Sequence, residues 1–431
     1  MPRTLRPDIA ITGYFSLVIL LGIASSLAGG GFGLTALTNA AMAFGVFSFL
    51  SLSLLTLLIG ETRRTPMIHR SVLPQVTLLC YMILVGFLIG AAAGNTRLYL
   101  FSTTLYWLNT LLFVFYVSTL DCTRLNLLRF GKAVIVITYL LTAAGIGVDS
   151  ELMIFLACIL IIFLLGERNT IWFLACLGIF VIKLGGLNRG FMLGIFICLF
   201  VGAVIYRRSF ILIALLALTT ALFFTFTTID PAQISAPGTP LYRRLTELQI
   251  LLSGSQPLEE LTALQQRLFE IQLVNQVMDE ASLIGRVLGA GFGRTLDMSA
   301  SADSSVLSAA TTGATHVHNV HSLYHSVYLR SGYLGVAYLA LVFLGMLTNV
   351  VRTIFVPVVS PLLAFCVLFP LLVFFSALPA ANYFLTSFML LALLALANIL
   401  IQQQKQEQEL PEHGPPSRPR LSGRRKIVWR G

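Results

Sequence analysis

Four of the chain's six histidines fall within one short stretch, His316-Val317-His318-Asn319-Val320-His321-Ser322-Leu323-Tyr324-His325. Imidazole is the side chain whose ordinary pKa lets it take up a proton near neutral pH, so one of these rings could be a catalytic base. His321 and His325 stand four apart and could instead bind zinc from one helical face, although no cysteine or HExxH glutamate lies nearby. The rings could also merely satisfy hydrogen bonds at a helix end. Composition leaves all three interpretations open.

The elements that must position these histidines are membrane helices. Of the 431 residues, 57% are hydrophobic and only 11% are charged, and the mean hydropathy is +0.88. A soluble domain has about 25% charged residues, and a membrane-spanning helix needs roughly 20 apolar ones. We therefore predict an all-α polytopic membrane protein with about twelve transmembrane helices and one large loop outside the membrane that contains helices; the resemblance described below implies that this loop is periplasmic. The net charge of +10 is read as a topology signal and not as a nucleic-acid surface.

The predicted spans divide the chain into four parts. Transmembrane helices 1–9 occupy residues 1–229, a periplasmic loop occupies 230–324, transmembrane helices 10–12 occupy 325–402, and a disordered cytoplasmic tail occupies 403–431. The apolar segments that define the spans are 9–29, 35–59, 75–94, 98–120, 132–149, 152–166, 170–184, 190–206, 209–229, 326–350, 354–378 and 384–402.

Basic residues orient these spans. With twelve spans, the N-terminus, the C-terminal tail and the Lys/Arg-bearing connections 61–74, 121–132, 167–169, 206–209 and 351–353 share one side. The positive-inside rule places that side, with both termini, in the cytoplasm. None of the six cysteines lies in the 230–324 loop, so the sequence implies neither a disulfide framework nor a cysteine metal site.

The long loop is expected to carry a helix over 257–282, because apolar residues recur there at spacings of three and four; they are Leu258, Leu261, Leu264, Leu268, Ile271, Val274 and Val277. Arg267 lies beside this stripe. A shorter helix is predicted over 241–252, and the glycine-rich turn 289–293 lacks the Gly-Lys-Ser/Thr ending of a P-loop. Residues 299–315, rich in Ser, Ala, Thr and Gly, read as a connector.

Three short motifs resemble those of the O-antigen ligases. His321-Ser322, followed after nine residues by Gly332-Tyr333-Leu334-Gly335, resembles the ligase signature at the end of the large periplasmic loop, just before the tenth span. Asn188-Arg189-Gly190 resembles a Ser-Arg-Gly element of ligases and of the related O-antigen polymerases, with asparagine in place of serine. Arg267-Leu268-Phe269 and the turn 289–293 resemble the family's loop arginine and Gly-x-Gly turn.

The resemblance implies a bacterial inner-membrane enzyme that uses no cofactor and no metal. Its donor would be a glycan linked to undecaprenyl pyrophosphate, and its acceptor a glycan or lipid A-core hydroxyl. His321 would be the base, while Arg189 and Arg267 would bind the pyrophosphate in bidentate fashion. His318 and Asn319 form the commoner His-Asn pair but lie fourteen residues before Gly332. They are assigned to substrate binding, with His318 as the reserve base.

Two further positions carry expectations. Arg330, near the start of the tenth span, could contact a lipid phosphate or snorkel to the interface. Gly332 and Gly335 are expected to allow close helix packing behind the histidine.

Other functions compete with the ligase. An O-antigen or exopolysaccharide polymerase uses the same donor, as does a protein O-oligosaccharyltransferase. A polytopic transporter would also have twelve spans, but transporters place charged residues in mid-helix and often show repeated halves, and neither feature is visible here.

Overall fold

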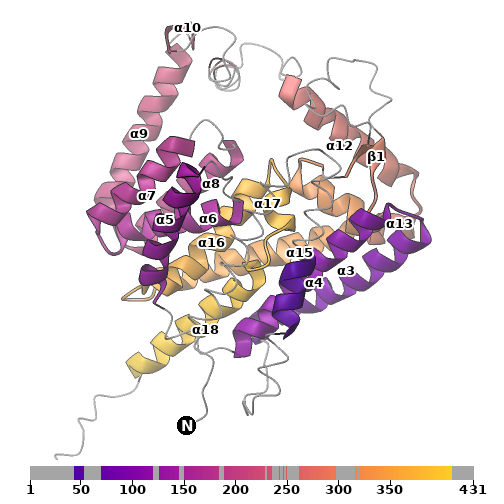
Figure 1. The fold of residues 1–431 in the computed structure, drawn as a ribbon, viewed down its shortest axis with the longest axis horizontal. Coiled ribbons are helices and arrows are strands. Elements are labelled where there is room, and N and C mark those ends of the chain that lie inside the picture. The colour runs from indigo at the N-terminus through magenta and orange to yellow at the C-terminus, as the bar shows by residue number, and fades with distance from the viewer. Residues whose placement is uncertain are drawn as a thin grey trace, which may run out of the picture.

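A computed structural model of the chain describes residues 43–52, 69–119, 126–144, 150–183, 189–228, 231–234, 262–297, 316–318 and 320–409, together with the isolated positions 242, 246 and 249. The described part is all-α apart from one pair of two-residue strands. Figure 1 shows helices α5 to α9 on one side, α3 and α4 on the other, and α15, α16 and α18 between them.

The helices follow the apolar runs of the sequence. After a helix over Ala43–Leu52, they are η1 (Arg70–Val72), α3 (Leu73–Ala92), α4 (Arg97–Thr119), α5 (Leu127–Ala143), α6 (Ser150–Leu165), α7 (Thr170–Lys183), α8 (Arg189–Ile205), α9 (Ser209–Thr228), α10 (Pro231–Ile234), α12 (Thr262–Glu280), α13 (Leu283–Leu288), α15 (Leu323–Ile354), α16 (Pro361–Ala377), α17 (Asn382–Leu385) and α18 (Leu390–Glu409). The strands are β1 (Leu296–Asp297) and β2 (His316–Val317).

These are the helices of a membrane protein. Among the described residues, three helical stretches are long and apolar enough to cross a membrane: Arg70–Ala92, Arg97–Val117 and Leu323–Ile354. Seven further apolar helices are shorter, at 10–17 residues. Each predicted span from 75–94 onward overlaps a helix, although α16 begins only at Pro361 and the segment 384–402 contains the end of α17, a break and the start of α18. Segment 9–29 lies outside the described residues, and 35–59 is described only over 43–52.

Helices α6 and α16 form the centre of the core. All side chains from Leu152 to Phe163 and from Leu362 to Val373 are buried, as expected for helices that are apolar on every face. Helix α16 packs mainly against α8, α18 and α6. It starts with Pro361 after Ser360, whose hydroxyl accepts a hydrogen bond from the Leu363 N–H; proline in the first turn with a serine cap is a strong helix start.

The structure corrects several predicted boundaries. Helix α12 is described from Thr262, and its fully buried face contains Glu270, Val274 and Met278, whereas Leu268 and Ile271 are only partly buried. Helix α18 continues to Glu409, past the predicted start of the tail at 403, because the glutamine- and glutamate-rich end extends the helix. The rest of the tail, the 299–315 connector and most of the predicted 241–252 helix lie outside the described residues.

Candidate functional site

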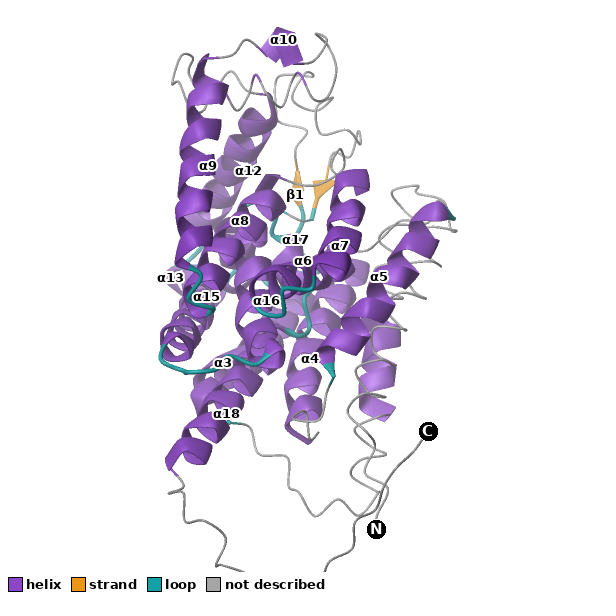
Figure 2. Cartoon of the chain, turned by 90° about the vertical axis from the view of Figure 1, so that its left-hand side faces the viewer, coloured by secondary structure: helices purple, strands orange, loops and turns teal. Residues whose placement is uncertain are grey.

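The loop helix α12 is attached to the start of α15 by a small core of its own. Six buried side chains pack together there, from α12, β1, the histidine segment and α15: Val274, Met278, Leu296, Val320, Tyr328 and Leu329. Strands β1 and β2 pair antiparallel, with Leu296 opposite Val317. Figure 2 shows α12 and β1 in the half of the molecule that carries α10, away from the C-terminal end of α18. The histidine segment is thus held between the loop helix and the bundle.

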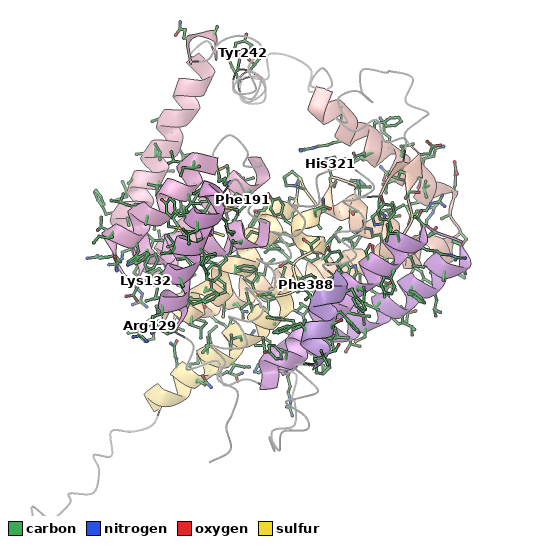
Figure 3. The ribbon with its side chains drawn as sticks, viewed as in Figure 1. Arg129, Lys132, Phe191, Tyr242, His321 and Phe388 are labelled. Atoms are coloured by element: carbon green, nitrogen blue, oxygen red, sulfur yellow. The ribbon has the colours of Figure 1, made fainter. Side chains whose placement is uncertain are left out.

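The backbone of His321 is fixed on two sides. Its N–H donates to Oε2 of Glu270 at 2.8 Å, and its carbonyl accepts from the N–H of Ala381 at 2.9 Å. Two residues on, the Leu323 N–H donates to the carbonyl of Leu378 at 3.2 Å. His321 therefore lies between α12 and the turn that joins α16 to α17 (Figure 3).

The imidazole of His321 forms a close pair with a carboxylate. Its Nδ1 lies 2.8 Å from Oε1 and 3.0 Å from Oε2 of Glu270. An ionised carboxylate only accepts hydrogen bonds, so Nδ1 is the donor in this contact, and in the neutral ring Nε2 would then keep its lone pair. The His321 side chain is 42% exposed while that of Glu270 is fully buried. None of the described residues hydrogen-bonds Nε2, which is the arrangement of a base open to an incoming hydroxyl.

The position of Glu270 within α12 is a signal in the sequence that could have identified this residue. Glu270 precedes Val274 and Met278 by one and two helical turns, so it shares their buried face. A carboxylate on the buried face of an amphipathic helix is costly without a partner. The residue is therefore a candidate for a paired functional group.

His318, the reserve base, is in a different environment. Its ring stacks on Tyr99 with centroids 4.1 Å apart. Nδ1 donates to the Arg294 carbonyl at 3.2 Å, while Nε2 accepts from the hydroxyl of Thr103 at 3.3 Å and from Arg330 at 3.4 Å. Burial lowers the pKa of His318 to about 3, helped by the nearby Arg330 charge and opposed by the Arg294 carbonyl. The ring is neutral and its lone pair is already engaged.

Arg330 differs from its expected position. The side chain is only 3% exposed, and it donates to the His318 carbonyl at 3.2 Å. The guanidinium is therefore enclosed by protein and not at the surface, where the sequence placed it. By donating to the His318 carbonyl, the buried Arg330 guanidinium helps to fix the position of the histidine segment.

His325, the histidine four residues after His321, has a different partner. His325 lies in the first turn of α15, where its Nδ1 hydrogen-bonds the Ser322 hydroxyl at 2.9 Å. His321 lies before the helix, so these two rings do not share a helical face as zinc binding would require. No group of three His, Cys, Asp or Glu side chains gathers anywhere in the described part of the chain. Asn319 lies outside the described residues.

Arg189 is the first residue of α8; its side chain is not among those the structure describes. Its neighbour Gly190 is buried, and a Cβ there would collide with Pro379 and approach the Ser376 carbonyl. Because Gly190 has no side chain, the start of α8 can pack directly against the turn between α16 and α17. Because that same turn binds the His321 carbonyl through Ala381, two motifs far apart in the sequence meet at one turn.

Arg267 lies on α12, three residues before Glu270, and is partly buried. A rise of about 1.5 Å per residue places the two α-carbons roughly 4.5 Å apart along the helix axis, on neighbouring faces. The structure thus puts this arginine one helical turn from the residue that binds His321.

The glycine-rich turn fixes the end of the loop to α3. Gly289, Gly291 and Gly293 all have positive φ, the region that favours glycine. The Phe292 N–H donates to the Gly86 carbonyl at 2.9 Å, and Asn95 donates to the Phe292 carbonyl at 2.9 Å. The Phe292 ring is fully buried and stacks near Trp107. This turn is an anchor for the loop.

Gly332 interrupts α15 with φ 59° and ψ −150°. A Cβ at this position would collide with the carbonyl oxygens of Arg286 and Val287 in α13. Gly332 therefore allows the close packing expected of it. A Cβ at Gly335 would meet Val327 and Ser331, which belong to the same helix but precede the break at Gly332.

No family model, curated protein or solved structure matches this chain.

Proposed function

We propose that the chain is a glycosyltransferase of the bacterial inner membrane that moves a glycan from undecaprenyl pyrophosphate to a hydroxyl of lipid A-core, without a metal, as O-antigen ligases do. The observation that carries the proposal is the pair formed by half-exposed His321 and buried Glu270, with contacts of 2.8 and 3.0 Å at Nδ1. This pair lies where the ligase-like motif ends the loop. It leaves one imidazole nitrogen free to take a proton.

The proposed topology has twelve spans, with both termini in the cytoplasm and residues 230–324 in the periplasm. Helices at the predicted spans and the basic connections between them support it. The basic turn between α8 and α9 has defined structure: Arg208 Nε donates to the Leu165 carbonyl at 2.9 Å, and Arg207 donates to the Ile354 carbonyl at 3.4 Å. They cap helix ends on the side assigned to the cytoplasm.

The reaction needs a base and a stabilised leaving group. Nε2 of His321 takes the proton of the acceptor hydroxyl while its oxygen forms a bond to the anomeric carbon. The bond from that carbon to the pyrophosphate oxygen breaks, and undecaprenyl pyrophosphate leaves with the electron pair. The imidazolium then returns its proton to solvent. Positioned base catalysis contributes about 10²- to 10⁴-fold.

Arg189 and Arg267 are proposed to bind the pyrophosphate. Guanidinium groups bind phosphate oxygens in bidentate fashion and stay charged at any working pH. Support comes from their positions: Arg189 starts α8 beside the turn that binds His321, and Arg267 lies one turn from Glu270.

The test is the surface polysaccharide of a deletion strain, separated on a gel beside its lipid-linked intermediates. Loss of the surface ladder with accumulation of long lipid-linked chains supports a ligase. A single repeat unit on the surface with no long lipid-linked chains would instead identify a polymerase. An unchanged surface ladder with an unglycosylated periplasmic protein would point to a protein O-oligosaccharyltransferase.

Complementation of that strain tests the base. His321→Gln should fail to restore the ladder, while His69→Gln should restore it, because His69 contacts Gln402 of α18 and not the His321–Glu270 pair. Both variants should reach the membrane in equal amounts on an immunoblot. A normal ladder with His321→Gln would contradict the assignment of the base.

A further inference from the structure

We infer that Glu270 is a positioning residue, which holds the proton of His321 on Nδ1 so that Nε2 is the nitrogen that accepts the acceptor's proton. The inference rests on the proposed function. The resemblance singled out Arg267 of this helix and gave Glu270 no role.

Two N–H groups of the same residue meet at Glu270. The His321 backbone N–H reaches Oε2 at 2.8 Å, and the ring Nδ1 lies 2.8 Å from Oε1 and 3.0 Å from Oε2. Both oxygens thus contact one histidine, and this fixes the backbone and the ring plane together. Charge-assisted hydrogen bonds of this length are about twice as strong as neutral ones. The ring therefore has one orientation and one tautomer.

The complete burial of the Glu270 carboxylate supports its role as the partner of His321. Glu270 is completely buried, although carboxylates are almost never fully buried without partners. The exposed acid Glu280 at the end of the same helix accepts a hydrogen bond from the Gln276 side chain at 3.2 Å. One helix thus carries a surface acid and a buried acid, and the buried one is directed at His321.

The Glu270 carboxylate would also stabilise the positive charge that develops on His321 while the new glycosidic bond forms. When Nε2 takes the proton, the ring becomes a cation, and the negative charge of Glu270 already lies 2.8 Å from its other nitrogen. A fixed charge beside a developing charge needs no rearrangement during the reaction. In the serine-protease triad, a buried aspartate holds a histidine in the same way, and its amide replacement lowers kcat by about 10⁴-fold while leaving the geometry intact.

Helix α12 does not depend on Glu270 for its place. Val274 and Met278 of α12 pack against Tyr328 and Leu329 of α15 in a separate small core. A glutamine at 270 has nearly the same shape and keeps a carbonyl oxygen for the His321 backbone N–H. The variant Glu270→Gln should therefore fold and should remove the charge alone.

The first experiment measures transfer by the purified full-length protein in lipid vesicles. The variants are Glu270→Gln, Glu270→Asp and the matched control Glu280→Gln. Glu270→Gln should lower kcat by about 10²- to 10⁴-fold with the donor KM changed less than about threefold, because the loss is in the transition state and not in donor binding. Glu270→Asp should recover part of the rate, and Glu280→Gln should match wild type. Full kcat in Glu270→Gln, or an equal loss in Glu280→Gln, would overturn the inference.

The second experiment does not use activity. Histidine labelled with ¹³C and ¹⁵N is read by solid-state NMR in the full-length protein, and the His321 signal is assigned by its absence in His321→Gln. Wild type and Glu280→Gln should show the tautomer protonated at Nδ1, and Glu270→Gln should lose it. A wild-type ring protonated at Nε2 alone would overturn the inference and leave the proposed function standing. The expected tautomer in a wild-type protein without transfer would instead refute the proposed function, and with it the catalytic role of Glu270.

Discussion

Two histidines three residues apart show how environment decides what an imidazole can do. His318 is enclosed by Tyr99, Thr103 and Arg330, and both ring nitrogens have partners. His321 is 42% exposed and shares one nitrogen with a carboxylate. The same side chain is thus a neutral structural group at one position and a candidate base at the other.

The low pKa of His318 predicts an acid-sensitive fold. In the folded protein the pKa is lowered to about 3, and the ordinary value is 6.5. Between these values the unfolded chain binds the proton and the folded chain does not. The stability from His318 is therefore complete above pH 6.5 and is lost as pH falls toward 3.

Thermal unfolding in detergent at pH 7 and pH 5 measures this effect. The wild-type Tm should fall from pH 7 to pH 5, and His318→Gln should show a smaller fall because it removes the group that titrates on unfolding. His69→Gln should keep the wild-type slope. An unchanged slope in His318→Gln would show that other groups cause the acid sensitivity.

At the residue scale the sequence predicted part of the site. Spacing to Gly332 selected His321 over His318; the structure gives the two rings different environments, and the choice of the base stays a prediction. Glu270 was not selected, because its contact with His321 spans 51 residues and only the packing of α12 on α15 creates it. Arg330 was misjudged because a cation near a span start was expected at the interface, whereas the fold buries it.

Among the elements, the glycine break in α15 gives a matched pair of substitutions. Gly332 and Gly94 have similar φ values of 59° and 67°. A Cβ at Gly332 would collide with α13, whereas a Cβ at Gly94 would meet nothing within 4 Å. The comparison separates backbone strain from a clash between helices.

Gly332→Ala should therefore destabilise the protein more than Gly94→Ala does. Strain in a disfavoured φ/ψ region costs on the order of 1–3 kcal/mol at either site, and only Gly332→Ala also pushes α13 away. The measurement is the Tm of each variant, with transfer activity as a second readout. Equal losses in the two variants would mean that α13 does not pack against the break.

The Phe292 ring should act as the anchor of the loop. Phe292→Ala removes a fully buried ring beside Trp107, and such changes in a core cost about 3–5 kcal/mol. Limited proteolysis should then cut the loop faster than in wild type. Phe101→Ala, at a ring that is 51% exposed on α4, should leave both Tm and cleavage rate near wild type, and equal proteolysis of both variants would contradict the anchoring role.

Hydropathy predicted the helices well and the loop less well. An apolar run of membrane length has few alternatives to a helix, so the described apolar segments are helical. The amphipathic stripe of α12 gave the helix, but its buried face is centred on Glu270, Val274 and Met278 because α15 and β1 decide which side is covered. The spacing of apolar residues predicts that a helix has a buried side. The elements that pack against the helix decide which side that is.

For the molecule as a whole, the proposed topology predicts opposite labelling of two sites. In a background with its native cysteines replaced, Glu280→Cys on exposed α12 should react with a membrane-impermeant maleimide in whole cells whose outer membrane is permeabilised. Arg207→Cys, in the turn between α8 and α9, should react only after the inner membrane is opened. Reaction of both sites in unopened cells would refute the assigned orientation.

The break at Gly332 also bears on how far the proposed reaction would lie from the lipid. Helix α15 has 32 residues, about 48 Å at 1.5 Å per residue, which exceeds a hydrocarbon layer of roughly 30 Å. The part after the break, 333–354, measures about 33 Å and fills that layer by itself. Gly332 would then mark the surface of the bilayer, and the nine residues from Leu323 to Ser331 would work as a spacer that holds His321 among the lipid head groups, level with the phosphates of a polyprenyl donor.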